Sequence, residues 1–193
     1  MTCNLPVTYN ETKYANLISY AQIGCNNYIR SLNLEDKKAL HIGIGTSSIL
    51  KYLRFIGVPC VIDGVTIIKE EMEVNLDYLD YGYNKLWLIN KYDPELFAKI
   101  SSYDMINDVN LKSSACCEDH WKNYFEKLLT VLKPGGILVT HTQGYPFLVP
   151  SKLKELTTAE LKSMLPEEYS LTEVTDLTNE YGHYPVVIKR GGV

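Results

Sequence analysis

Apolar and polar positions along this chain follow two alternating patterns, one typical of helices and one typical of strands. Apolar residues recur at helical spacing in six segments, at 12–32, 46–57, 69–82, 93–101, 114–132 and 157–165. Short runs rich in apolar residues lie between them, at 38–45, 58–67, 85–90, 103–109, 137–142, 169–177 and 184–190. Helices alternating with strands predict an α/β fold, with a doubly wound, mostly parallel seven-stranded sheet and helices on both faces. No helix separates the last two strands, so we expect the last strand to be antiparallel.

Local signals set several of the expected helix ends. Asp93 is a good N-cap for the helix at 93–101, with Pro94 in its first turn. Gly57 and Gly82 are expected to end two other helices, as glycine often does. The helix at 114–132 carries one apolar stripe, formed by Cys117, Trp121, Phe125, Leu128 and Leu132. We expect a single domain over 1–193, with an N-terminal helical lid region (1–36) and a Rossmann-like core (37–193).

The junction after the first predicted strand reads "HIGIGTS", residues 41–47. Ligands of open α/β sheets bind beyond the carboxyl ends of the strands, where the strand order reverses. Glycines at such a place let the backbone approach a ligand closely or adopt a positive φ. Gly43 and Gly45 therefore mark this loop as the first place to look for a binding site.

Four features together resemble the class I S-adenosylmethionine-dependent methyltransferases over about residues 12–189. "HIGIGTS" resembles their acid-x-Gly-x-Gly-x-Gly loop, and "YDMIND" resembles their fourth strand. The most specific match is "LLTVLKPGGILVT", which resembles the passage from helix through Lys-Pro-Gly-Gly into a strand. The fourth feature is the closing strand pair. The resemblance implies that S-adenosylmethionine is the cofactor, and that S-adenosylhomocysteine is the product.

The resemblance implies that the loop backbone wraps the methionine part of the cofactor. The cofactor-binding residues expected there are Gly43, Ile44, Gly45, Thr46 and Ser47. Two positions depart from the family pattern. Ser47 replaces the third glycine, and His41 replaces the acid that helps to hold the cofactor's ammonium group. A neutral imidazole accepts one hydrogen bond but supplies no full negative charge.

Three further positions are expected to contact the cofactor. Asp63 lies at roughly the 20-residue spacing at which dinucleotide folds place their ribose acid, and the resemblance implies the same role for it. A second register, like that of the cyclopropane-synthase branch, ends the strand at Thr66 and puts Asp63 inside it. Asn90, expected to end strand three, is either an adenine or ribose contact or a loop cap. Asn107 would hold the methionine end or a substrate amine.

The substrate side is expected at the ends of strands four and five. Asp108 and His141 are the candidate catalytic residues, because methyl transfer needs a positioned nucleophile and sometimes a base. Strand alternation would also allow His141 to point into a helical layer, and Asp108 to cap a loop. Tyrosines before the first strand, and Tyr145 and Phe147 after strand five, could line the rim of the site. In the alternative interpretation, Tyr14 and Tyr28 pack the opening helix against the core.

Other readings of single motifs are weaker. "CCEDH" suggests zinc, but adjacent cysteines on a helix point about 100° apart. A structural zinc also needs four ligands, so we expect no metal. A nicotinamide-binding domain would need a third glycine at the place of Ser48. Spermidine-synthase relatives transfer the aminoalkyl arm of the sulfonium cofactor instead of its methyl group. Their Gly-Gly-Gly-Asp-Gly loop and paired catalytic acids are absent from this sequence.

Composition narrows the partners. The net charge is -4, and the basic residues are thinly spread, which argues against nucleic acid. No apolar stretch is long enough to span a membrane, and the chain start does not resemble a signal peptide. Five cysteines without a C-x-x-C pair favour a reducing, cytoplasmic location. The sequence leaves a homodimer possible.

The sequence therefore predicts methyl transfer from S-adenosylmethionine to a nitrogen or oxygen of a small molecule. His41 and Ser47 favour an alternative, in which the protein keeps the fold without transfer activity and serves as a binding or partner subunit.

Overall fold

The computed structural model describes residues 20–45, 53, 57–76, 83–113, 115–142 and 156–192. Only the backbone is described at 20, 70 and 74–76. The predicted helix at 46–57 lies almost wholly outside these ranges, as do Thr46, Ser47, Tyr14, Tyr145 and Phe147.

The described strands form one seven-stranded sheet in the order β3-β2-β1-β4-β5-β7-β6. Their bounds are β1 Lys38–Ile42, β2 Val61–Thr66, β3 Lys85–Leu88, β4 Tyr103–Asp108, β5 Leu132–His141, β6 Tyr169–Glu173 and β7 Pro185–Arg190. Every pair from β3 to β5 is parallel, while β7 runs antiparallel to both β5 and β6. The predicted sheet, with its antiparallel last strand, is confirmed.

The chain order reverses beside β1, which pairs with β2 on one side and with β4 on the other. Successive strands move outward from β1 to β3, and the chain then returns to place β4 against the free side of β1. The carboxyl ends of β1 and β4 are therefore the switch point, where ligands of such sheets bind.

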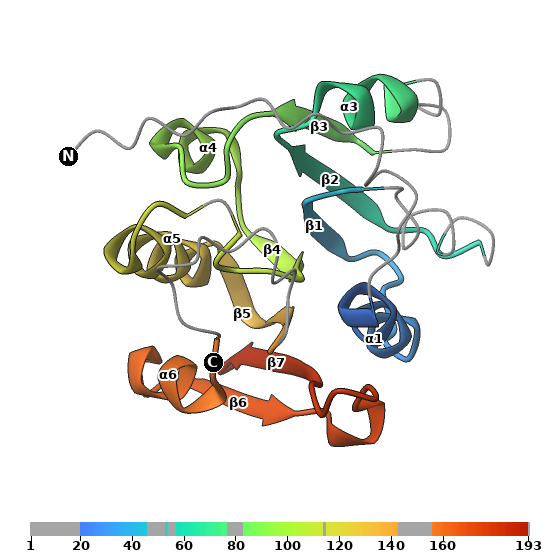
Figure 1. The fold of residues 1–193 in the computed structure, drawn as a ribbon. Helices are drawn as coiled ribbons and strands as arrows, with labels where there is room; N and C mark the ends of the chain where they lie inside the picture. The colour runs from blue at the N-terminus through green and yellow to red at the C-terminus, as the bar shows by residue number, and fades with distance from the viewer. Residues whose placement is uncertain are drawn as a thin grey trace.

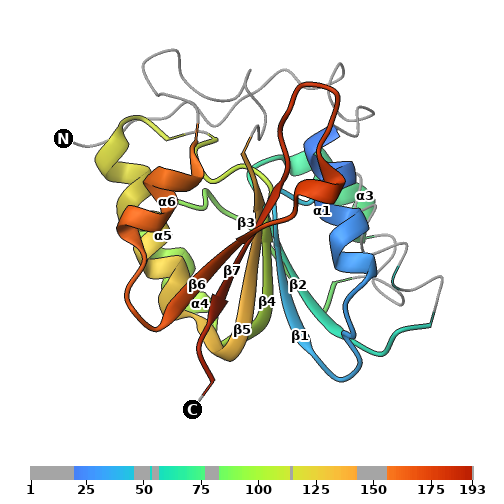
Figure 2. The same cartoon turned by 90° about the horizontal axis from the view of Figure 1, so that it is seen from below.

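Helices cover both faces of the sheet, as Figures 1 and 2 show. On one face lie α1 and α3, and on the other lie α4, α5 and α6 (Figure 2). The helix bounds are α1 Tyr20–Arg30, α3 Lys69–Leu76, α4 Pro94–Lys99, α5 Glu118–Thr130 and α6 Thr158–Met164, with a 3-10 turn η3 at Thr175–Leu177. Among the described helices, none has the length and apolar character needed to cross a membrane.

Each face of the sheet has its own apolar core. The core beneath α4, α5 and α6 contains Trp121, Phe125 and Leu128 of the predicted stripe, all with 0% exposure. Cys117 does not belong to it, contrary to the sequence prediction. It is the exposed N-cap residue of α5, because the helix begins only at Glu118.

The passage at 133–136 also differs from expectation. The sequence pattern places this passage between a helix that ends at 132 and a strand that begins at 137, yet β5 already begins at Leu132 and runs through both glycines. The pairing with β4 shifts register between Tyr103 and Met105. Gly135 has a φ of 77°, which places this irregular stretch in the left-handed region.

The predicted cap of α4 is confirmed, since the Asp93 carboxylate accepts the N–H of Glu95 at 2.9 Å. We expect Asp93→Ala to lower the free energy of unfolding by about 1 kcal/mol, because one helix donor loses its acceptor. Urea denaturation would measure the change. Asp93→Asn, which keeps a capping oxygen, is the control, and an equal loss in both variants would contradict the capping role.

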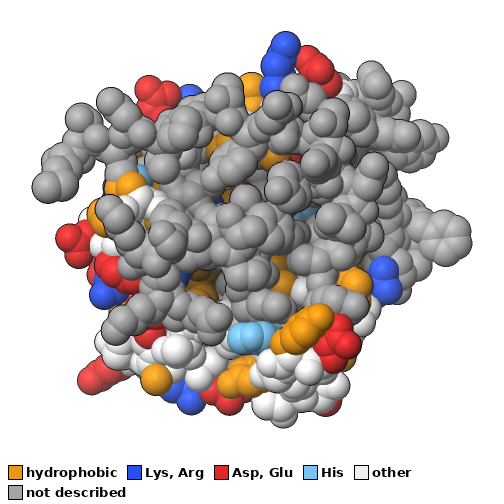
Figure 3. All heavy atoms as spheres, in the orientation of Figure 1, with side chains coloured by type: hydrophobic (Ala, Val, Ile, Leu, Met, Phe, Trp, Pro, Cys, Tyr) orange, Lys and Arg blue, Asp and Glu red, His pale blue; other side chains and the backbone are white. Residues whose placement is uncertain are grey.

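On the face shown in Figure 3, the described acidic and basic side chains are interspersed around the rim.

Candidate functional site

The loop that follows β1 bends as the glycine pattern predicts. Gly43 has a φ of 71° and Gly45 a φ of 48°, a region that residues with a Cβ avoid. A Cβ built on Gly43 would meet no described atom within 4 Å, and one on Gly45 would meet only Gln22, at 3.8 Å. Ile44 between them is fully buried and anchors the loop in the α1-side core. Among the described residues, the glycines of this loop thus combine a left-handed backbone with no close neighbour at the Cβ position.

A carboxylate that the sequence did not single out lies against this loop. Glu71, in the first turns of α3, accepts the N–H of Gly45 at 3.2 Å and the hydroxyl of Thr66 at 2.7 Å. Thr66 is the last residue of β2, so one carboxylate joins the ends of two neighbouring strands. Burial raises the pKa of Glu71, although both hydrogen bonds oppose the shift. The only hint in the sequence is the run of acids that opens this helix, a pattern that the helix dipole alone would explain.

Asp63 does not end its strand, so the predicted position is wrong and the alternative register, with Thr66 last, is correct. Asp63 lies inside β2 and is 1% exposed. Its carboxylate accepts the hydroxyl of Tyr103 at 2.8 Å and the side-chain amide of Asn84 at 3.0 Å, and Lys38 lies at 3.5 Å. These partners offset the cost of burying a charge inside a strand.

His41 of β1 and Asn107 of β4 are neighbours on the α1 side of the sheet. They are register partners between β1 and β4, so their side chains leave the sheet on the same face. His41 Nδ1 lies 2.9 Å from the hydroxyl of Tyr83, and burial lowers the pKa of His41 to about 4. Within the described part of the chain, His41 Nε2 and both polar atoms of the Asn107 side chain have no hydrogen-bond partner. This neutral pair is suited to meet a polar group of a ligand or a water molecule.

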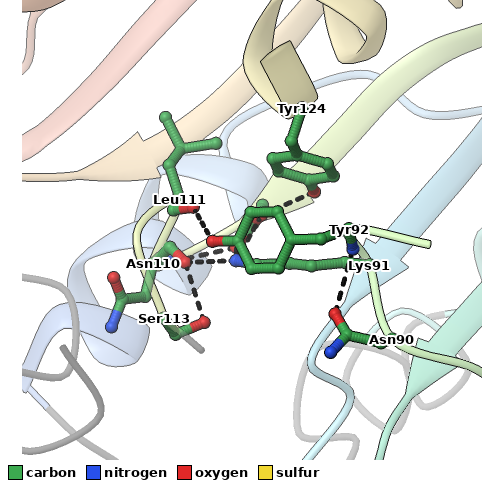
Figure 4. A network of polar contacts seen from close by, with 8 residues as sticks. Asn90, Lys91, Tyr92, Asn110, Leu111, Ser113 and Tyr124 are labelled. Atoms are coloured by element: carbon green, nitrogen blue, oxygen red, sulfur yellow. Dashed lines mark hydrogen bonds and ion pairs between the residues drawn. The ribbon is translucent and has the colours of Figure 1, made fainter. Parts of the chain in front are cut away.

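Asp108 ends β4 as predicted, but its carboxylate is already engaged on the opposite face. Lys91 donates to its two oxygens at 3.2 and 3.0 Å, and Tyr124 donates to it at 2.7 Å. The N–H of Asn110 adds a fourth contact at 3.1 Å. Figure 4 shows this network from close by, with Lys91 and Tyr92 lying beside Asn110. As placed, Asp108 is a poor candidate for a base, because its acceptor positions are filled.

Asn90 lies two residues beyond β3, which ends at Leu88 rather than at Asn90. Its side-chain oxygen accepts the N–H of Tyr92 at 3.0 Å, the loop-capping geometry that the sequence had left open (Figure 4). Lys91, the next residue, was missed by the sequence analysis. The available signal was a cation directly after one strand and an acid at the end of another, which share one edge of a parallel sheet.

His141 ends β5 and points into the helical layer, the alternative that strand alternation had allowed. A Cβ on Gly24 of α1 would lie 3.5 Å from His141 Nε2, so α1 packs directly against the imidazole. Burial, with a contribution from His183, lowers the pKa of His141 to about 4. The predicted role of His141 as a base would therefore require a neutral, buried imidazole to accept the proton.

The remaining residues singled out in the sequence are Tyr28 and those of the cysteine–histidine motif. Tyr28 is partly buried against the α1-side core, which agrees with the packing reading. Cys116 Sγ lies 3.4 Å from His120 Nδ1. Over the described ranges, no three His, Cys, Asp or Glu side chains are grouped to hold a metal ion.

Comparisons with known proteins found similarity in structure only. No family model and no curated protein matches the sequence. The N-methyltransferase NodS from Bradyrhizobium japonicum WM9, in complex with S-adenosyl-L-homocysteine, matches with a TM-score of 0.66 and 10% identity, covering 95% of this chain and 94% of that one. An O-methyltransferase family protein from Burkholderia thailandensis matches with a TM-score of 0.62 and 12% identity, over 89% of this chain and 57% of that one. The cyclase SpnF matches with a TM-score of 0.60 and 14% identity, over 90% and 82%.

Proposed function

Because the chain has the fold of the class I S-adenosylmethionine-dependent methyltransferases, we propose that it binds this cofactor at the carboxyl ends of β1 and β4 and transfers its methyl group. One observation carries the proposal. The left-handed glycines after β1 lie at the switch point beside a partly buried carboxylate, that of Glu71. A loop of this kind accepts a ligand against its backbone, and a carboxylate beside it is a charged acceptor for hydroxyl groups.

The described residues fit an S-adenosyl group in three respects. Gly43 and Gly45 supply the close backbone approach, and Glu71, in place of Asp63, is an acid hydrogen-bonded to that loop. His41 and Asn107 supply polar atoms that have no partner among the described residues, on the α1 side where the methionine end would lie. The bound cofactor would contribute an electrophilic methyl group on a sulfonium. The protein's own part is to bind, orient and exclude water.

We propose a nitrogen or oxygen atom of a small molecule as the methyl acceptor. The net charge of -4 and the scattered basic residues support a small substrate over a nucleic acid. The printed names of two similar structures, an N-methyltransferase and an O-methyltransferase family protein, support the same atom types. Transfer of labelled methyl from S-adenosylmethionine to a panel of small amines, phenols, DNA and RNA would test the choice.

A second candidate is a protein of this fold that binds a ligand or partner without methyl transfer. A neutral His41 and an Asp108 occupied by Lys91 favour it, because neither supplies a free charge at the switch point. A cyclase among the similar structures shows that the fold also serves other chemistry. Labelled transfer to no acceptor, together with tight binding of the cofactor product, would support this candidate.

We expect the wild-type protein to bind S-adenosylhomocysteine in isothermal titration, and Glu71→Gln to weaken that binding by about tenfold or more. The reason is the loss of charge-assisted hydrogen bonds to the ligand, worth about 1.5–3 kcal/mol. Glu73→Gln, on the same helix and more exposed, is the matched control and should bind like wild type. No wild-type binding at millimolar ligand would reject the proposed function, and equal affinity in Glu71→Gln would reject the role of Glu71.

A further inference from the structure

We propose that Lys91 is a positioning residue whose ion pair with Asp108 bridges the switch point and holds together the segments that follow β3 and β4. In this role Asp108 is an anchor rather than a base. The part of the inference that concerns ligand affinity rests on the proposed function, whereas the bridge itself does not.

The bridge uses every hydrogen-bonding position of the two charged groups. The Lys91 ammonium donates to both Asp108 oxygens and to the carbonyl of Asn110, which accounts for its three protons. Asp108 also accepts from Tyr124 and from the N–H of Asn110, which fills its four acceptor positions. The side chains of Lys91 and Asp108 are 8% and 3% exposed. Nothing in this geometry leaves the carboxylate ready to take a proton from a substrate.

The bridge also spans an unusual distance in the sheet. β3 and β4 are separated by β2 and β1, so their axes lie about 14 Å apart at ordinary strand spacing. Lys91 follows β3, yet its ammonium reaches the last residue of β4. Tyr92 makes a parallel link, since its hydroxyl donates to the carbonyl of Leu111 (Figure 4). The segment 90–92 therefore passes the carboxyl end of β1 to meet the segment 108–113.

Stability alone is a weak reason for this arrangement. Burying an ion pair costs desolvation, and apolar residues of similar volume often stabilise a core as well or better. Burial indeed lowers the pKa of Lys91, with Asp108 opposing the shift. What an apolar pair could not supply is the set of directed bonds to the backbone of Asn110. Those bonds fix the two segments relative to each other.

Anchoring Asp108 also orients its neighbour. Successive residues of a strand point to opposite faces, so a carboxylate held on the α5 side directs the Asn107 amide to the α1 side. There Asn107 lies beside His41, close to the loop of Gly43 and Gly45. The bridge therefore fixes the end of the strand from which Asn107 projects an amide that has no partner among the described residues.

The test compares three proteins with the wild type. Lys91→Met leaves a buried carboxylate without its cation, and we expect its melting temperature to fall by about 10 °C. The triple variant Lys91→Met, Asp108→Leu, Tyr124→Phe replaces the charged cluster by apolar groups but leaves the N–H and carbonyl of Asn110 without these partners, so it should recover only about half of that loss. Lys99→Met removes the exposed pair with Glu95 and is the matched control, with no change expected.

Two measurements on the triple variant decide the question. We expect amide hydrogen exchange at 89–92 and 109–113 to be about tenfold faster than in wild type. We also expect affinity for S-adenosylhomocysteine to be about tenfold weaker. Unchanged exchange would overturn the bridge, and faster exchange with unchanged affinity would overturn its link to the ligand. A wild-type protein that does not bind the ligand would reject the proposed function, while the exchange measurement would still decide the bridge.

Discussion

Replacing Asp63 with leucine is expected to lower the free energy of unfolding by about 3 kcal/mol, because a buried hydroxyl loses its acceptor and the ion pair with Lys38 is broken. The hydroxyl belongs to Tyr103, which has 0% exposure and donates to Asp63 at 2.8 Å. Lys38 and Asn84 also lose a partner, but both reach solvent. Affinity for S-adenosylhomocysteine should stay unchanged, because Asp63 lies inside β2. Urea denaturation and isothermal titration measure the two quantities.

The isosteric variant Asp63→Asn separates structure from binding. It keeps an acceptor for Tyr103, so its loss of stability should be clearly smaller than that of Asp63→Leu. If Asp63 held the ribose as the spacing suggested, Asp63→Asn would lose ligand affinity by tenfold or more at nearly unchanged stability. That result would restore the residue to the site and refute the assignment of Glu71.

Acidification from pH 7 to pH 4 is expected to remove about 3 kcal/mol of stability for each of His41 and His141. Burial lowers the pKa of both to about 4 in the folded protein, against an ordinary value of 6.5. Between these values the unfolded chain binds more protons than the folded chain does, so stability falls as the pH drops through this window. The combined loss approaches the whole stability of a typical domain. Urea denaturation at a series of pH values would measure it.

Two variants test whether these rings are the cause. His41→Asn removes one titrating group and should flatten the pH dependence by about half, since the two histidines contribute similarly. His120→Asn, at a partly exposed position on α5, is the control for replacing a histidine outside these two buried sites. A flat profile between pH 7 and pH 4.5 in the wild type would show that the two rings are not buried in their neutral form.

Local pattern predicted the architecture well. Residue spacing distinguished strands from helices, and the missing helix between the last two strands predicted the antiparallel β7. The cap at Asp93 was predictable because a cap depends on residues only two positions apart. The errors arose where a choice depended on distant residues. Cys117 fits the stripe of α5 by spacing, but the helix starts one residue later and leaves it exposed.

The candidate site was predictable only in part. The glycines after β1 were found because the ability to adopt a positive φ is a property of glycine itself. Asp63 was misplaced because strand ends are set by pairing with β1, and because Tyr103 and Asn84 make an interior aspartate tolerable. Glu71 was missed because its contacts come from the ends of two strands and a helix that only the fold brings together.

By itself, the sequence determined the order of helices and strands, the bend at Gly43 and Gly45, and the sheet edge where a ligand would bind. Periodicity and backbone conformational preference act over a few residues, so a single chain displays them directly. Only the tertiary structure decided that Glu71 is hydrogen-bonded to the loop, that Asp63 accepts a hydrogen bond in the core, and that Lys91 forms an ion pair with Asp108. The physical reason is that the state of a charged group depends on its burial and its partners. The contacts Lys91–Asp108, Glu71–Gly45 and Asp63–Tyr103 join residues that lie 17, 26 and 40 positions apart in the chain.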